Sequence, residues 1–189
     1  LHEALRLVLG DHVAQRGSMV SPDRLRFDFV HTKPMSPQEL AQVEDIANDI
    51  VLQNSAVETR LMGVEEAKSS GARALFGEKY GDEVRVVSMG RNTHGAGRPI
   101  YSLELCGGTH VTAAGDIGFF KIISESGIAA GVRRIEAVTG TGAVRFVQAM
   151  EDDQNTLAAL VKAEAGGILA RVERILARQR ELQREVENL

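Results

Sequence analysis

The order of strand-like and helix-like segments constrains the fold of this sequence most strongly. Alternation of apolar and polar residues, typical of half-buried strands, occurs at 18–20, 25–30, 57–62, 84–89, 101–106, 117–125 and 132–138. Helical spacing of apolar residues occurs between them, at 1–15, 36–53, 63–71 and 141–150. Because the helices interrupt the strands irregularly, without a βαβ repeat, we expect an α+β fold with a largely antiparallel sheet.

Two segments show this organisation most clearly. Ser36, Pro37 and Glu39 form a capping box with proline at the first helical position, so we expect a helix to begin there. In the strand at 25–30, the period of two places Phe27 on one face and Asp28 on the other. This strand is therefore expected to bury one face and to present a polar face to solvent or to a site.

Residues 151–189 differ from the rest because their apolar residues recur at alternating steps of three and four, as far as Leu189. Such a heptad pattern predicts a long helix. Gly166 and Gly167 interrupt it, and each glycine costs about 1 kcal/mol relative to alanine in a helix, so we expect a kink there. We expect a domain at 1–150 and an arm at 151–189, which either packs on the domain or forms a coiled coil or half of a helical hairpin.

The composition excludes several classes of protein. Hydrophobic residues make up 43% and charged residues 25% of the 189 positions, as in ordinary globular proteins. No run approaches the roughly 18 apolar residues of a transmembrane helix, so no membrane partner is expected. A single cysteine excludes an internal disulfide and favours a reducing, cytoplasmic location. The net charge is −4, and neither part carries a basic excess, so nucleic-acid binding would need local patches.

Cys106 and His110 form the motif with the most chemical content. Two glycines follow the cysteine, and the histidine comes four positions after it. Three interpretations are open: a small buried apolar side chain, a thiolate activated by the histidine, or two ligands of a zinc site. The glycines favour the zinc site, because they permit the positive φ angles that would bring both ligands to one point. Two ligands do not complete a zinc site.

Charged residues near this motif offer further candidates. Glu104 shares a strand face with Cys106, so it either lines the same cavity or is a solvated residue of the sheet. Arg133 and Arg134 lie on opposite faces of a strand, where one of them either contacts phosphate or is an ordinary solvated charge. Three further basic residues are candidates for the same phosphate contact: Lys121, Arg91 and Arg98.

Taken together, these segments resemble the editing domain of alanyl-tRNA synthetase. The resemblance rests on the runs Leu105-Cys-Gly-Gly-Thr-His-Val111, 115–122, 124–140, 1–18 and Arg26-Phe-Asp-Phe29. It covers residues 1–150, and the tail is similar to the helical connector towards the C-terminal domain of that enzyme. It implies a curved, largely antiparallel sheet around a helix. The ATP-dependent ligase activity belongs to the domains of the full-length enzyme that this sequence does not contain.

The resemblance also implies a reaction and a cofactor. Editing domains of this family hydrolyse the ester of tRNA(Ala) mischarged with serine or glycine. Their zinc is held by an H-x-x-x-H pair together with a C-x-x-x-H pair, and Cys106 and His110 match the second pair. The first pair would precede residue 1, on the opening helix, which starts in the middle of its pattern without an N-cap. We therefore expect an N-terminally truncated domain with an incomplete zinc site and slow or absent hydrolysis.

The resemblance assigns roles to further residues of this chain. The positions that match the catalytic pocket are Gln15, Asp28 and Thr109. The positions that match substrate or tRNA recognition are Phe27, which lines the pocket, and Asp116 and Arg133, which are linked to the acceptor stem. Zinc would either polarise a water molecule or hold the amino group of the substrate.

Two other functions compete with editing by a synthetase. One is a non-catalytic tRNA-binding or oligomerisation module that self-associates through the C-terminal helix. The other is a free-standing editing protein that acts on tRNA in trans. Comparing the chain with a version extended upstream would distinguish the first of these from a truncated enzyme.

Overall fold

The structure, a computed structural model, describes residues 1–73, 81–94 and 99–188. It divides into two compact units, Leu1–Ala143 and Val144–Leu189. Two residues singled out in the sequence, Arg98 and Leu189, lie outside the described residues. The expected boundary after residue 150 falls inside a helix that crosses from the first unit into the second.

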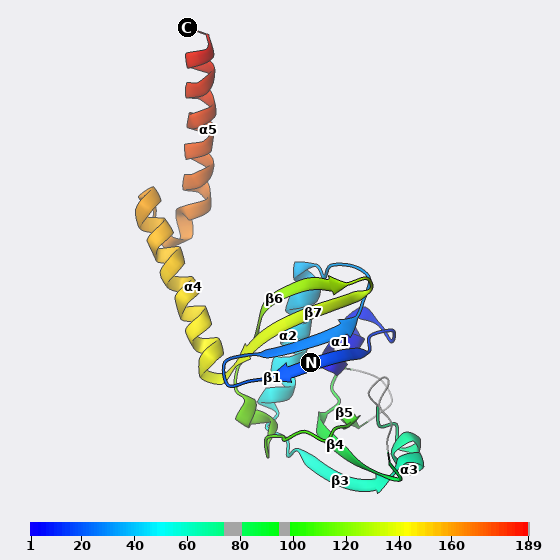
Figure 1. The fold of residues 1–189 in the computed structure, drawn as a ribbon. Helices are drawn as coiled ribbons and strands as arrows, with labels where there is room; N and C mark the ends of the chain where they lie inside the picture. Colours follow the sequence, from blue (N-terminus) through cyan, green and yellow to red (C-terminus); the bar gives the residue numbers. More distant parts are fainter. Residues whose placement is uncertain (74–80, 95–98, 189) are drawn as a thin grey trace. The chain divides into compact units, whose positions relative to one another are not determined.

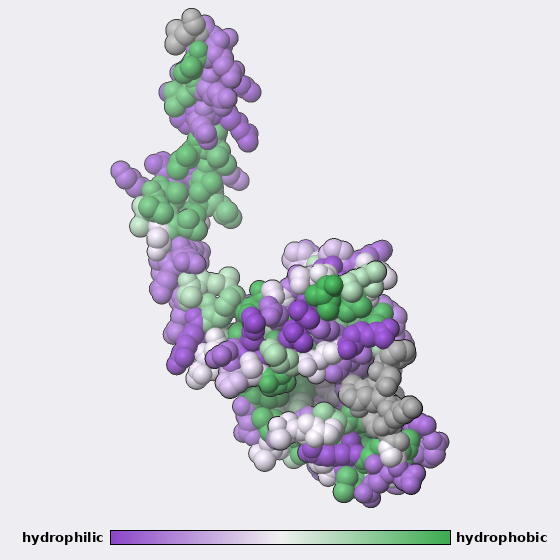
Figure 2. All heavy atoms as spheres, viewed as in Figure 1, coloured by the Kyte–Doolittle hydropathy of each residue, from purple (hydrophilic) through white to green (hydrophobic). Residues whose placement is uncertain are grey.

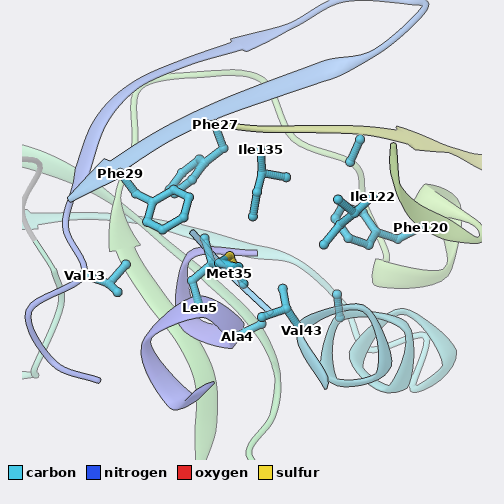
Figure 3. Close-up of a cluster of buried hydrophobic side chains, with 12 residues drawn as sticks. Ala4, Leu5, Val13, Phe27, Phe29, Met35, Val43, Phe120, Ile122 and Ile135 are labelled. Carbon is cyan, nitrogen blue, oxygen red and sulfur yellow. The ribbon is translucent and has the colours of Figure 1, made fainter. Parts of the chain in front are cut away.

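A four-stranded antiparallel sheet forms the larger part of the first unit (Figure 1). Its strands, in spatial order, are β1 (Gln15–Val20), β2 (Leu25–Val30), β7 (Val132–Thr139) and β6 (Phe120–Ala129). Helices α1 (His2–Leu9) and α2 (Pro37–Leu52) pack against one face of this sheet. In Figure 3 the side chains of Leu5 and Val43 point from these helices towards Phe29 and Ile135 of the strands. These four side chains are fully buried, and they are the centre of the core.

Helix α2 also hydrogen-bonds to the outer edge of strand β6. The side-chain amide of Asn48 accepts from the N–H of Phe120 over 2.8 Å and donates to its carbonyl oxygen over 2.9 Å. Glu44 accepts from the N–H of Ile122 over 2.6 Å and pairs with Lys121 over 2.8 Å. The helix side chains thus take the place of a neighbouring strand along this part of β6. The capping box predicted at Ser36 is present and begins this helix.

A second, three-stranded antiparallel sheet completes the first unit. Its strands, in spatial order, are β3 (Glu58–Gly63), β4 (Glu83–Arg91) and β5 (Ile100–Leu105). The short helix α3 (Val64–Ser69) contributes Ala67 to a small core with Val84, Val86 and Leu105. The 3-10 turn η1 (Ala114–Ile117) leads from this sheet back to β6. The α+β class, the antiparallel pairing and the long C-terminal helix predicted from the sequence are confirmed.

The second unit is helical. Helix α4 (Gly140–Val161) begins in the first unit and is followed by the 3-10 turn η2 (Ala165–Gly167) and helix α5 (Ile168–Glu187). The break predicted at the two glycines is therefore present. Figure 2 shows hydrophobic residues gathered over the end of α4 and the start of α5. Several of them are exposed: Leu157, Leu160, Leu169, Ile175 and Leu176. No helix among the described residues is both long and apolar enough to span a membrane.

Two expected helix boundaries were wrong. The first helix ends at Leu9 instead of residue 15, because Gly10 adopts a φ of 112° that does not continue a helix, and strand β1 begins at Gln15. The helix expected at 141–150 continues to Val161, where Lys162 follows with a φ of 54°. Its apolar spacing runs directly into that of the tail, which explains why one helix was taken for two segments.

Candidate functional site

The turn after strand β5 carries the cysteine and the histidine of the C-x-x-x-H motif. Strand β4 pairs with β5, and the N–H of Cys106 donates to the carbonyl oxygen of Arg85 on β4 over 3.0 Å. The guanidinium Nη1 of Arg85 donates to the carbonyl oxygen of Gly107 over 3.2 Å and also to that of Gly108. The first three residues of the turn are therefore fixed to the neighbouring strand through a single arginine.

The two glycines of this turn have different surroundings. Neither Gly107 nor Gly108 adopts a positive φ, so the conformational reason expected for them was wrong. A Cβ on residue 108 would lie 3.6 Å from the Sγ of Cys106, whereas a Cβ on residue 107 would meet no atom of the described residues within 4 Å. Glycine at position 108 therefore leaves the sulfur uncovered on that side.

Helix α1 connects the two sheets close to this turn. The Nδ1 of His2 lies 3.2 Å from Oε2 of Glu104 on β5, and its ring lies 5.5 Å, centroid to centroid, from that of Phe27 on β2. Arg73 makes a second connection, since it pairs with Glu3 of the same helix. The Nε2 of His2 is buried and has no hydrogen-bond partner among the described residues. His2 alone thus contacts a strand of each sheet, and Glu3 adds a contact to Arg73 outside the strands.

Glu104 is a largely buried carboxylate that is paired with His2. The interpretation of Glu104 as a solvated residue of the sheet is therefore not supported. Its side chain is 20% exposed, and its Oε1 accepts a hydrogen bond from Ser102 over 3.4 Å. Burial acts to raise the pKa of Glu104, but the hydrogen bond to His2 and the charges of His2 and Arg73 together bring that pKa below its ordinary value. The carboxylate is therefore held in its ionised form.

The residue types on the turn suit zinc, but their number does not. Cys106 is a free, half-buried thiol. Partial burial and then the charge of Arg85 lower the pKa of His110, which favours the neutral imidazole that binds metals. In residues 1–73, 81–94 and 99–188, no three His, Cys, Asp or Glu side chains are grouped so that they could hold an ion. The described residues alone therefore do not complete a zinc site.

Two of the predicted catalytic residues lie on the four-stranded sheet. Gln15 begins strand β1, where its Nε2 donates to the Oγ of Ser18 over 3.0 Å. Asp28 points away from the core and accepts two hydrogen bonds from Arg134 of β7, over 2.7 and 2.8 Å. These bonds lower the pKa of Asp28 against the opposing effect of burial. The carboxylate of Asp28 is thus ionised and already occupied by an arginine.

The two residues predicted to recognise the acceptor stem also have partners within the chain. Arg133 forms a bidentate ion pair with Glu125 of strand β6, with N···O distances of 2.5 and 2.7 Å. Asp116 caps the turn η1, where it accepts from the N–H of Ala113 and the hydroxyl of Thr112, both over 3.0 Å. The hydrogen bond from the N–H of Ala113, followed by that from the hydroxyl of Thr112, lowers the pKa of Asp116 below its ordinary value. These bonds use Nε and Nη2 of Arg133 and Oδ2 of Asp116, so a contact with RNA through the same atoms would compete with the partners within the chain.

The structure brings together only part of the predicted site. Cys106, Thr109 and His110 share one exposed turn, and no hydrogen bond of the Thr109 side chain to a described residue is present. The other predicted residues lie on the four-stranded sheet or on η1: Gln15, Phe27, Asp28, Arg133 and Asp116. Their assigned roles stay predictions. Sequence reasoning missed Arg85, because only the pairing of β4 with β5 reveals that it reaches the turn.

The chain is similar to known proteins both in the region of the turn and over its whole length. Residues 84–136, which include the turn and Arg85, match the family model of the threonyl and alanyl tRNA synthetase second additional domain. The chain is 58% identical over 188 residues to an alanine–tRNA ligase of Chelativorans sp. strain BNC1 and, over the same length, to one of Rhizobium johnstonii. It is 57% identical to that of Rhizobium meliloti.

These matches cover the chain almost completely but the relatives only in part. The aligned region is 98% of this chain in each case. The chain spans 21% of the length of each of these three ligases. The similarity thus extends over both compact units, including the helical arm beyond the region that the family model matches.

Proposed function

The chain belongs to the alanyl-tRNA synthetase family, and on this premise we propose that it carries the editing activity of such an enzyme. The proposed reaction is hydrolysis of the ester that joins serine or glycine to tRNA(Ala). The observation that carries the proposal is the turn at Cys106–His110, which presents a free thiol and an imidazole beside two open glycines within the matched domain.

The residues of the turn suit the recognition of a small aminoacyl ester. An ester carbonyl has to come close to backbone and side-chain donors, and glycines leave room for this approach. Thr109, Cys106 and His110 add a hydroxyl, a thiol and an imidazole that could contact the amino group or the hydroxyl of serine. Gln15 is proposed to border the same pocket, where its amide can both donate and accept. Zinc, once bound by a complete ligand set, would supply a Lewis acid.

The partner of this reaction is proposed to be tRNA(Ala) charged with the wrong amino acid. Membership of a synthetase family makes tRNA the expected macromolecular partner. With a net charge of −4, the chain has no general attraction for RNA and would depend on local contacts. We further propose a cytoplasmic location, as expected for a free thiol and for the reaction itself.

Hydrolysis of mischarged tRNA tests the proposal directly. Ser-tRNA(Ala), Gly-tRNA(Ala) and correctly charged Ala-tRNA(Ala) would be incubated with the 189-residue chain and with a version extended upstream by its natural sequence. We expect the extended version to release serine and glycine faster than the uncatalysed rate and to spare alanine. Release of none of the three amino acids by either polypeptide would refute the proposal.

A second function is favoured by one specific observation. Among the described residues, the metal-ligand types on the turn are too few for a zinc site, while helix α5 exposes an apolar seam that includes Ile175, Leu182 and Val186. These features suit a non-catalytic module that binds tRNA and self-associates through its arm. Binding of tRNA(Ala) without hydrolysis in the assay above, together with dimers in sedimentation, would favour this module.

A further inference from the structure

The carbonyl groups of the Cys106–His110 turn are held in an unusual way, which determines where its N–H groups point. One nitrogen, Nη1 of Arg85, donates to the carbonyl oxygens of both Gly107 and Gly108. In a trans peptide unit the N–H points opposite to the C=O. The N–H groups that belong to these two peptide units, those of Gly108 and Thr109, are therefore directed away from the arginine and towards the same side.

These two N–H groups have no partner within the part of the chain that the structure describes. Neither Gly108 nor Thr109 donates a backbone hydrogen bond to another described residue. Both residues are exposed. Two successive amides that face one side form a concavity that binds anions, as in other backbone nests. Because residues 107 and 108 lack side chains, nothing of their own covers this concavity.

The guanidinium also strengthens these donors. A hydrogen bond to a peptide oxygen polarises the peptide unit, so its N–H becomes a better donor. Arg85 does this to both units at once and adds a full positive charge behind them. Its backbone fixes the start of the turn as well, since its carbonyl oxygen accepts from the N–H of Cys106. The donors are thus aligned before any ligand arrives.

From this geometry we propose that Arg85 is a positioning residue that presents the N–H groups of Gly108 and Thr109 as an oxyanion-binding pair. This inference rests on the proposed hydrolysis of the aminoacyl ester. In that reaction a water oxygen attacks the ester carbonyl carbon, and the carbonyl oxygen becomes an oxyanion. The bond from carbon to the ribose oxygen then breaks, and a proton originating from the water ends on the ribose oxygen. The two amides stabilise the oxyanion while it exists.

The glycines fit this role. An oxyanion site requires donors about 2.7–3.1 Å from the oxygen, so the carbonyl carbon has to lie almost against the backbone. A Cβ at residue 107 would meet no described atom within 4 Å and would narrow the space left for an ester, and a Cβ at residue 108 would stand beside the sulfur of Cys106. The Gly-Gly pair is thereby explained by access to the turn and not by a left-handed backbone.

The kinetic test replaces Arg85 by methionine and by lysine. It uses whichever of the two polypeptides, the chain or its extended version, hydrolyses Ser-tRNA(Ala). Arg85→Met removes both hydrogen bonds and should lower kcat by about tenfold or more, with KM changed less than about twofold, because an oxyanion forms only after binding. Arg85→Lys should restore most of kcat, since one nitrogen makes both contacts. A kcat of Arg85→Met within about twofold of the parent would overturn the inference.

A matched control separates this role from general destabilisation. Arg60 lies on the adjacent strand β3, and its side chain is 72% exposed. Within the described part of the chain, its ion pair is with Glu58. Arg60→Met removes an arginine of the same sheet and should leave kcat and KM within about twofold. Thermal unfolding of each variant, followed by circular dichroism, confirms that the activities compared are those of folded protein.

A second measurement does not depend on hydrolysis. Inorganic phosphate would be titrated into the ¹⁵N-labelled 189-residue chain, and the amide resonances of Gly108 and Thr109 followed by NMR. We expect a saturable downfield shift of both resonances in the parent and in Arg85→Lys, and its loss in Arg85→Met. Absence of the shift in the parent, or an equal shift in Arg85→Met, would overturn the inference. Failure of hydrolysis alone would count against the proposed function and leave this result to decide the role of Arg85.

Discussion

The ion pair between Asp28 and Arg134 is expected to stabilise the four-stranded sheet by a measurable amount. Its two charge-assisted hydrogen bonds join neighbouring strands, and the side chains are only 10% and 28% exposed. Hydrogen bonds to charged groups contribute about 1.5–3 kcal/mol, whereas exposed ion pairs contribute about 0–1 kcal/mol. The partial exposure of the arginine places this pair towards the lower part of the first range. We therefore expect a coupling free energy of about 2 kcal/mol.

A double-mutant cycle measures this quantity. The free energy of unfolding in urea at pH 7 would be determined for the parent, Asp28→Ala, Arg134→Met and the double variant. The pair Glu58 and Arg60 is the control, because its atoms are 2.9 Å apart but its side chains are 56% and 72% exposed. That control cycle should give less than about 1 kcal/mol. A coupling below about 0.5 kcal/mol between Asp28 and Arg134 would refute the reasoning from burial.

The same pair predicts a pH dependence with a definite sign. The hydrogen bonds from Arg134 lower the pKa of Asp28 in the folded protein, while the unfolded chain keeps the ordinary value of about 4. The contribution of Asp28 to stability is therefore complete above about pH 4 and is lost as the pH falls through the folded-state pKa. Repeating the cycle at pH 7 and at low pH should show the coupling shrink. A coupling that grows on acidification would contradict this assignment.

The remaining predictions concern one helix and one turn. Asn48→Ala leaves two backbone groups of edge strand β6 without their partners and should lower the free energy of unfolding by about 2 kcal/mol. Gln42 lies on the exposed face of the same helix, so Gln42→Ala should change this free energy by less than about 0.5 kcal/mol. Equal effects of the two substitutions in urea unfolding would contradict the edge contact. Gly108→Ala should slow the reaction of Cys106 with a thiol reagent, because it would place a methyl group 3.6 Å from the sulfur. Gly107→Ala would place no methyl group there and should leave the rate unchanged. Identical labelling rates for the two variants would count against this account of the glycines.

Local patterns in the sequence predicted most of the elements. Alternation of apolar and polar residues was sufficient to predict strands β2 and β7, and the capping box located the start of α2 at Pro37. Helix ends were less predictable. A glycine in the middle of an apolar pattern can be tolerated or can end a helix, and Gly10 ends one through its positive φ.

The site was predicted only as far as its local motif. Cys106 and His110 lie on one short segment after β5 with a bend at Gly108, and their role as a ligand pair stays a prediction. The contacts that organise this turn come from distant positions, since Arg85 lies on the neighbouring strand and Glu104 is paired with His2 of the first helix. Such contacts depend on which strands pair and in which register, and a single sequence does not display either.

The way in which α2 covers β6 limits how this protein can associate through its backbone. In the order β1-β2-β7-β6, the two outer strands are the places where an extended segment of another chain could add to the sheet. Asn48 and Glu44 already occupy backbone groups of β6, so an incoming strand would have to displace them. Strand addition along the first residues of β6, Phe120 to Ile122, is therefore opposed by α2, whereas the backbone of β1 on the opposite edge meets no such helix side chains among these contacts.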